Sequence, residues 1–325
     1  MKKYVFGVDI GGTKTDVGLI TLNGSVVEKI RWNTFKVGGW KANITNIIDV
    51  INNLHKKHIK KKDRIMGIGI GAPGPMDFEK GMILSPPNMF GWDYVPFVDC
   101  LKKKIKLPTI MDNDANAAGL GENIFGAGIG ANSLFYFTVS TGIGGGLIID
   151  KKIHHGFTFD AAEIGHMTVN LEGPVCNCGK VGCLEMYSSG TSIARFARQM
   201  VRPTFRRRLD SKILKIAGIR ENISTKVVAE AAMLGDKTAR YVIEQAAYYL
   251  GFATSAVIQI VNPEVVVFGG SVMKMGALFL KPLKDSVKKF TWKRPFESCK
   301  ILRAKLGDDT GVLGAASLVI SKTPR

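Results

Sequence analysis

Long apolar runs are absent from this 325-residue sequence, and cysteine is scarce, with five residues. No stretch reaches the roughly 18 uninterrupted apolar residues that a membrane-spanning helix needs. The apolar run after Lys2 and Lys3 is interrupted by Asp9 and by glycines, and no small-residue cleavage site follows it, which argues against an export signal. We therefore expect a cytoplasmic protein with no membrane partner. Disulfides are rare in that compartment, so the cysteines are not expected to pair.

Acidic residues are also scarce, with 27 Asp and Glu against 45 Lys and Arg, so the net charge is +18. Basic residues cluster at 55–64, 202–208 and 288–294. Such charge is typical of nucleic-acid binding, or of a solvated surface that attracts anionic substrates. No helix-turn-helix pattern and no basic motif interleaved with aromatic residues accompanies the charge. We therefore expect the second case and no nucleic-acid partner.

Two parts of the sequence repeat one pattern. Residues 4–9 and 15–20 are apolar and β-prone and flank a glycine turn, and residues 134–140 and 147–150 do the same. The two units stand about 130 residues apart, with no low-complexity linker between the halves, which predicts two related α/β domains. Periodicity predicts further strands at 65–71, 106–111 and 265–270, and helices at 42–59, 117–126, 191–200, 226–261 and after 309.

Three glycine turns follow apolar strands, at Gly11–Gly12, Thr141–Gly146 and Gly269–Gly270. Such turns let backbone N–H groups approach a phosphate without a Cβ in the way. A single turn is equally well explained as an ordinary hairpin, and the P-loop fingerprint is absent. Three of them suit a nucleotide in a cleft, with its phosphates contacted from both domains. Beside the first turn, Thr13 adds a hydroxyl, Lys14 adds a positive charge, and Asp9 could lie near a hydrated magnesium ion.

The polar run Asp112–Asn113–Asp114 follows a short predicted strand, where a helix should begin. Helix capping explains one such residue, but three exceed that role. A carboxylate at a strand end that faces a cleft can accept a proton from a substrate hydroxyl. We therefore favour a catalytic role for this run over capping alone.

One histidine and three cysteines form the most specific pattern, with the spacing H-x9-C-x-C-x4-C. One imidazole and three thiolates are a standard tetrahedral set for structural zinc and leave no open position for catalysis. The spacing C-x-C is not the redox spacing C-x-x-C, and the alternative is a group of reduced structural cysteines. We expect a structural zinc ion on His166, Cys176, Cys178 and Cys183, and buried thiols at Cys100 and Cys299.

Glu163 and Glu185 flank this zinc loop on either side. Each would, taken singly, be a solvated surface residue. Metal ligation fixes the backbone between them, so it can hold two carboxylates near one another. Paired carboxylates accept hydrogen bonds strongly, which suits a polyhydroxylated ligand.

Seven motifs follow one another along the sequence: DIGGTK, GIGIGAPGPMD, PPNMFGW, DNDANAA, TGIGGGLIIDKKIHHG, EIGH and CNCGKVGCLE. In this order they resemble the ROK family of sugar kinases (repressors, open reading frames and kinases), and the resemblance runs from Val5 to about Ala316. It implies the duplicated actin-like ATPase (ribonuclease H-like) α/β fold, with two domains around a cleft. We place a small N-terminal α/β domain at 1–118, completed by a C-terminal helix at 308–325, and a large α/β domain with the zinc loop at 119–307.

The resemblance implies transfer of the ATP γ-phosphate to a sugar hydroxyl, with Asp114 as the base that acts on the 6-hydroxyl of a hexose. His166 would bind zinc through one ring nitrogen and face the sugar with the other. The other implied sugar contacts are Gly74, Asn113, Asp114, Glu163 and Glu185. The implied contacts to ATP are Gly11, Gly12, Thr13, Lys14, Thr141, Gly142, Gly269 and Gly270, together with Asp9 near Mg²⁺.

Glucose is the substrate that we expect first, as the commonest in the family. N-acetylmannosamine is second, because its kinases share motifs like EGPVC and YSSG around the zinc loop, and fructose is third. Some members are transcriptional repressors with a helix-turn-helix segment before the DIGGT strand. Only four residues precede Val5, so we expect an enzyme rather than a regulator without catalysis. The family also implies a homo-oligomer, a dimer or a tetramer, and offers no role for the arginine-rich segment 202–212.

Overall fold

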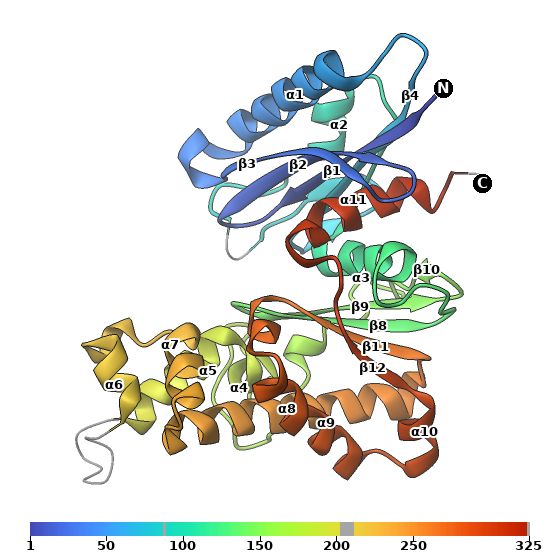
Figure 1. Cartoon of the computed structure of the whole chain (residues 1–325). Coiled ribbons are helices and arrows are strands. Elements are labelled where there is room, and N and C mark those ends of the chain that lie inside the picture. Colours follow the sequence, from blue (N-terminus) through green and yellow to red (C-terminus); the bar gives the residue numbers. More distant parts are fainter. Residues whose placement is uncertain (87–88, 202–210, 324–325) are drawn as a thin grey trace. The chain divides into compact units, whose positions relative to one another are not determined.

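The computed structural model describes residues 1–86, 89–201 and 211–323 (Figure 1). These residues form two compact units, one of 1–134, 146–161 and 304–325, and one of 135–145 and 162–303. The predicted border at 118 falls within helix α3 (Asp114–Phe125), so the units divide the chain elsewhere, and the assignment of domains to 1–118 and 119–307 stays a prediction. The arginine-rich segment lies almost entirely outside the described residues. None of the helices within them is both long and apolar enough to cross a bilayer.

The first unit contains a five-stranded sheet in the order β3-β2-β1-β4-β7. Strand β1 is antiparallel to β2 and parallel to β4, which confirms the predicted hairpin. Strand β3 was not predicted, because its half-exposed residues alternate charged and apolar types over only part of its length. The strands span Lys3–Ile10 (β1), Lys14–Thr21 (β2), Val26–Asn33 (β3), Arg64–Ala72 (β4) and Thr109–Asn113 (β7).

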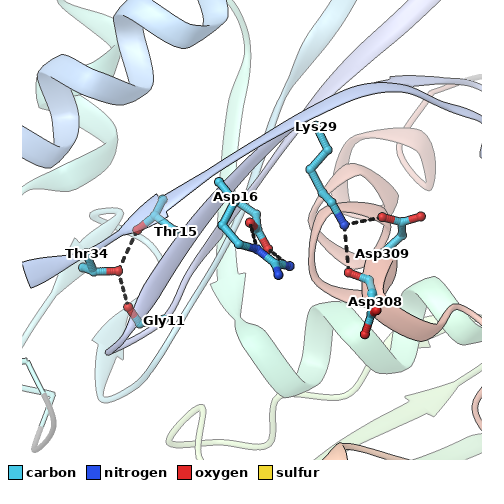
Figure 2. A network of polar contacts seen from close by, with 8 residues as sticks. Gly11, Thr15, Asp16, Lys29, Thr34, Asp308 and Asp309 are labelled. Atoms are coloured by element: carbon cyan, nitrogen blue, oxygen red, sulfur yellow. Dashed lines mark hydrogen bonds and ion pairs between the residues drawn. The ribbon is translucent and has the colours of Figure 1, made fainter.

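Helices cover both faces of this sheet (Figure 1). Successive residues of a strand point to opposite faces. Accordingly, Tyr4 and Phe6 pack in the core with α1 (Gly39–His58), while Val5 packs with α11 (Thr310–Ile320). Lys29 of β3 donates to the Asp308 carbonyl at 3.0 Å and contacts the Asp309 carboxylate, so the start of α11 is also tied to β3 (Figure 2).

A second sheet repeats the strand order of the first, as β10-β9-β8-β11-β12. This repetition confirms the duplication predicted from the two strand–turn–strand patterns. Its central strands are buried, and the rings of Phe137 and Phe268 stack with centroids 5.0 Å apart. The strands span Leu134–Val139 (β8), Ile143–Ile149 (β9), Lys152–Ile153 (β10), Val265–Gly269 (β11) and Lys300–Arg303 (β12), and a separate small sheet joins Met76–Asp77 (β5) to Met82–Ile83 (β6).

The predicted helical stretch at 226–261 is interrupted once, because two helices share this range. Helix α7 (Thr225–Met233) ends before Gly235, which has a left-handed φ of 89°. Helix α8 (Lys237–Val261) begins after Asp236, whose carboxylate accepts a hydrogen bond from the Ala239 N–H at 2.8 Å. The other helices are Phe97–Lys102 (α2), Glu185–Ser188 (α4), Gly190–Met200 (α5), Lys212–Ala217 (α6), Ala277–Phe290 (α9) and Lys293–Ser298 (α10).

Candidate functional site

The first predicted phosphate turn joins β1 to β2 and is fixed by a buried threonine pair (Figure 2). The Gly11 N–H donates to the Lys14 carbonyl at 2.9 Å. The Thr34 hydroxyl donates to the Gly11 carbonyl at 2.7 Å and lies 3.0 Å from the Thr15 hydroxyl. The side chains of Thr13 and Lys14 are exposed at the turn. A rigid turn with a hydroxyl and an ammonium group on its exposed side can bind an anion.

Asp9 lies near the end of β1, opposite Asp16 in the register of β1 and β2. Arg31 binds both carboxylate oxygens of Asp16, at 2.6 and 2.8 Å. Burial raises the pKa of Asp9 to about 6, the Asp16 charge acts in the same direction, and the Lys14 charge opposes it. The Asp9 carboxylate lies against the start of α11, because a Cβ on Gly311 would be 2.0 Å from its Oδ2. A nearby cation would therefore stabilise the ionised form that burial disfavours.

The predicted catalytic run forms the junction of β7 and α3. Asn113 caps α3, since its Oδ1 accepts from the N–H groups of Ala115 at 2.8 Å and Asn116 at 3.3 Å. Asp114 is the first helical residue, and its side chain is exposed. Capping thus accounts for Asn113, while Asp114 presents an exposed carboxylate in the first turn of α3.

The loop that contains Gly74 lies beside this junction. A Cβ on Gly74 would be 3.6 Å from the Asn113 side-chain nitrogen, and a Cβ on Gly71 would be 3.6 Å from the Asp114 Cα. The structure thus brings together the three predicted sugar contacts of the first unit, Gly74, Asn113 and Asp114. Their roles remain predictions.

The four predicted zinc ligands converge in the second unit, with donor atoms within 4.8 Å of one another. The Cys176 sulfur is 3.8 Å from His166 Nδ1, and the Cys178 sulfur is 3.6 Å from that of Cys183. Ligands of a tetrahedral zinc ion with ordinary bond lengths lie about 3.5–3.8 Å apart, so this set fits zinc. The sulfur separation also excludes a disulfide between these two cysteines.

Two glycines shape the zinc loop. Gly179 and Gly182 adopt left-handed φ angles of 83° and 69°. A Cβ on Gly182 would be 1.7 Å from the Asn170 carbonyl oxygen, so no larger residue fits. The lone cysteines differ from one another: Cys299 is buried as predicted, whereas Cys100 is only half-buried, so that part of the prediction is wrong.

The two glutamates beside the zinc loop are held by different contacts. Glu185 begins α4, and its Oε2 accepts from the Ile143 N–H at 2.8 Å. A Cβ on Gly142 would be 2.4 Å from the same oxygen. Glu163 precedes the short helix Ile164–His166, and its carbonyl accepts from the His166 N–H at 3.0 Å. The predicted sugar residue Glu185 thus touches the predicted phosphate turn at Thr141–Gly142, which the sequence did not indicate.

The third predicted turn lies beside the second. Gly270 has a left-handed φ of 90°, and a Cβ there would be 2.3 Å from the Val139 carbonyl oxygen. The Ser271 hydroxyl is 3.0 Å from the Ser140 hydroxyl. The predicted ATP contacts Thr141, Gly142, Gly269 and Gly270 therefore lie on two adjacent turns of the second unit.

Two buried carboxylates make contacts that were not predicted. Glu122 of α3 accepts hydrogen bonds from the N–H groups of Ala127, Lys305 and Leu306 at 2.7 to 3.2 Å. Asp112 lies 2.7 Å from His155 Nε2. The sequence carries no signal for Glu122, and the polar run itself is the only signal for Asp112.

Comparisons with known proteins identify related chains. The ROK family model matches residues 5–322. A glucokinase of Halalkalibacterium halodurans is 39% identical over 98% of this chain and 95% of its own length. A xylose repressor of Caldicellulosiruptor bescii is 31% identical over 98% of this chain and 78% of its own length. The crystal structure of a ROK family glucokinase from Streptomyces griseus, in complex with glucose and AMPPNP, is 32% identical with a TM-score of 0.79, and the match covers 97% of this chain and 98% of that one.

These similarities confirm the actin-like ATPase fold that the resemblance implied, and the repeated strand order is consistent with it. They cover nearly the whole chain, including each of the turns described above. The chain belongs to the ROK family.

Proposed function

We propose that this chain is an ATP-dependent hexose kinase that transfers the γ-phosphate of ATP to the 6-hydroxyl of glucose. The junction of β7 and α3 carries the proposal, because Asn113 caps the helix and an exposed carboxylate, Asp114, follows it. The similarity to glucokinases over nearly the whole chain supports the same function.

Asp114 would accept the proton of the 6-hydroxyl while the hydroxyl oxygen bonds to the γ-phosphorus. The bond from that phosphorus to the β–γ bridging oxygen breaks, and ADP leaves with the electron pair. Lys14 and Thr13 would contact phosphate oxygens from the first turn, and Thr141–Gly142 from the second. The Gly269–Gly270 turn would contact the adenosine side. Magnesium held near Asp9 would neutralise phosphate charge when bound.

The sugar would be oriented by hydrogen bonds to Asn113, Glu163, His166 and Glu185. The His166 Nδ1 faces the Cys176 sulfur, so we propose that Nε2 contacts a sugar hydroxyl. Zinc held by the four clustered donors would have a structural role, since all four positions are filled by protein.

The test is a coupled ADP-release assay on glucose, mannose, fructose, N-acetylglucosamine and N-acetylmannosamine. Glucose is expected to give the highest kcat/KM. A clear preference for N-acetylmannosamine or fructose would support the proposed kinase activity but change the proposed substrate. If none of these sugars caused ADP release, the proposal would be refuted.

The role of Asp114 is tested by Asp114→Asn, which should lower kcat about 10³-fold while glucose binding survives, because a general base contributes rate rather than affinity. Asp99→Asn is the matched control, since Asp99 is also exposed in the first turn of a helix of the same unit. Near-parent turnover in Asp114→Asn would remove this residue as the base.

The similarity to a xylose repressor favours one further candidate function, regulation of transcription. We propose no nucleic-acid partner, so gel shifts at physiological salt should show no sequence-specific complex. A DNA site bound with nanomolar affinity would instead favour the transcriptional regulator over the kinase.

We further propose a homo-oligomer, and light scattering measures the mass that tests it. We place the activity in the cytoplasm, because the zinc set needs reduced thiols.

A further inference from the structure

His155 lies between two segments of the candidate site in the first unit. Its Nε2 is 2.7 Å from Asp112 Oδ2, and its ring centroid is 5.0 Å from that of Phe78. The side chain is 29% exposed, and Phe159 lies on it with a centroid separation of 6.0 Å. The His155 ring is thus fixed by one polar contact and two aromatic contacts.

Asp112 uses both carboxylate oxygens to hold the junction of β7 and α3. Its Oδ1 accepts from the Asn113 N–H at 2.8 Å and from the Asn116 side-chain amide at 3.1 Å. Its Oδ2 contacts His155, and its side chain is only 7% exposed. A buried carboxylate that loses a partner is costly and tends to reorient. The backbone that carries Asn113 and Asp114 therefore depends on the contact with His155.

Phe78 connects His155 to the second segment. It follows β5 (Met76–Asp77), which comes directly after the Gly74–Pro75 loop. The Gly74 loop and the Asp112–Asp114 run are separate in sequence, and His155 contacts Asp112 in the run and Phe78, which lies four residues after Gly74. These two segments hold the sugar contacts predicted for the first unit.

We propose that His155 is a positioning residue that fixes the Gly74 loop and the Asp114 turn relative to each other, without touching the reacting atoms. Its consequence for catalysis rests on the proposed kinase function. Small misplacements of a catalytic group lower turnover strongly, so loss of this link should lower kcat more than it lowers affinity for ATP.

Two variants separate the polar contact from the aromatic ones. His155→Phe keeps a ring against Phe78 but removes the group that pairs with Asp112. His155→Gln places an amide nitrogen near the Nε2 position but removes the ring. His58→Phe is the matched control, because His58 Nε2 is 2.6 Å from Glu28 Oε2 in the same unit, with a side chain 24% exposed.

We expect His155→Phe to lower kcat about tenfold with an unchanged KM for ATP. His155→Gln should keep kcat within about threefold and raise the KM for the sugar, because Phe78, which follows the Gly74 loop, loses its contact with the His155 ring and keeps the one with Phe159. Equal losses of kcat in His155→Phe and His58→Phe would overturn the proposal, since they would report general stability rather than positioning.

Hydrogen exchange gives a readout that does not depend on activity. The amides of Asn113, Ala115 and Asn116 should exchange faster in His155→Phe than in the parent, and at the parent rate in His58→Phe. Unchanged exchange at these amides would overturn the inference even if kcat fell. An inactive parent would refute the kinase function, while the exchange result would still decide whether His155 positions the turn.

Discussion

Asp9 shows that burial of a single carboxylate can lower the stability of the fold. Burial and the neighbouring Asp16 raise the pKa of Asp9 to about 6, from an ordinary value of 3.8. Between these pH values the folded protein binds a proton that the unfolded chain has lost. Its stability therefore falls as pH rises through this window and stays lower at neutral pH. A cation near Asp9 would reverse this effect by favouring the ionised form.

Asp9→Asn should therefore stabilise the protein at pH 7.5 by up to about 3 kcal/mol, because it removes a charge that burial disfavours. The gain should vanish below about pH 3, where Asp9 is protonated in both the folded and the unfolded state. Urea unfolding at the two pH values measures the difference in stability between variant and parent. The kcat of the variant should fall although its stability rises. A variant less stable than the parent at pH 7.5 would contradict this account of Asp9.

Asp16→Asn is the contrasting variant at the neighbouring carboxylate. It breaks the two-pronged contact with Arg31, whose pKa the hydrogen bond with Asp16 raises. Because Asp16 is buried and Arg31 is partly exposed, we expect a loss of about 1–3 kcal/mol at neutral pH. If Asp9→Asn raises the stability and Asp16→Asn lowers it, then the pairing of a buried carboxylate, and not its burial alone, determines its effect on stability.

Among the elements, α11 approaches the first sheet more closely than side chains normally allow. A Cβ on Gly69 of β4 would be 1.7 Å from the Ala315 carbonyl oxygen, and a Cβ on Gly7 of β1 would be 2.0 Å from that of Val312. Two residues further along β4, a Cβ on Gly71 would make ordinary contacts at 3.6 Å. Glycine is thus needed at some positions of the strand and not at others.

Gly69→Ala should destabilise the protein by about 2–4 kcal/mol, because α11 must move away from the sheet. Gly71→Ala is the matched control on the same strand, with an expected change within about 1 kcal/mol. Thermal unfolding of both variants measures these changes. Equal changes in melting temperature would mean that α11 can move away from the sheet without loss of stability.

The zinc loop is the second element for which we predict a measurable property, its metal content. Purified protein should contain about one zinc ion per chain, and Cys176→Ser should lose it, melt at a lower temperature and bind sugar more weakly. Cys299→Ser should keep the metal, although Cys176 and Cys299 are both buried, at 3% and 8% exposure. Folded, active protein without metal would refute the structural role.

Elements with clear periodicity were predicted well, and the others were not. The hairpin of β1 and β2 and helices α1, α5 and α11 lie close to their predicted ranges. The break between α7 and α8 was readable in principle, since Gly235 followed by Asp236 is a stop and start signal. Strand β3 gives a weaker pattern because it is half-exposed, and α9 contains Pro282, which argues against a helix in sequence.

At the scale of the whole molecule, the duplication was visible in the sequence because the turns at Gly11–Gly12 and Thr141–Gly146 both follow apolar strands. The zinc set was also visible, since its members lie within a short segment and their chemistry is specific. The pairing of Asp112 with His155 spans 43 residues and depends on how separate elements pack. No local pattern encodes such a contact, so sequence reasoning singled out the candidate catalytic run at 112–114 but not the contact of Asp112 with His155.

The net charge of +18 leads to a prediction about the assay itself. Long-range attraction favours the approach of ATP and is screened by salt, whereas a neutral sugar feels no such attraction. Raising KCl from about 0.05 to 0.5 M should increase the KM for ATP several-fold and leave the KM for the sugar unchanged. Parallel changes in both would indicate a general effect of salt on the enzyme.

The position of α11 against β1 has a consequence for biosynthesis. The strands of the first sheet leave the ribosome early, but Val5 and Ile20 remain uncovered until Val312 and Ala316 have been translated. Residues 162–303 are complete before that point, so the second unit can fold while the first still exposes an apolar face. A nascent chain therefore exposes this apolar face until α11 has been synthesised, and such a face is prone to aggregation.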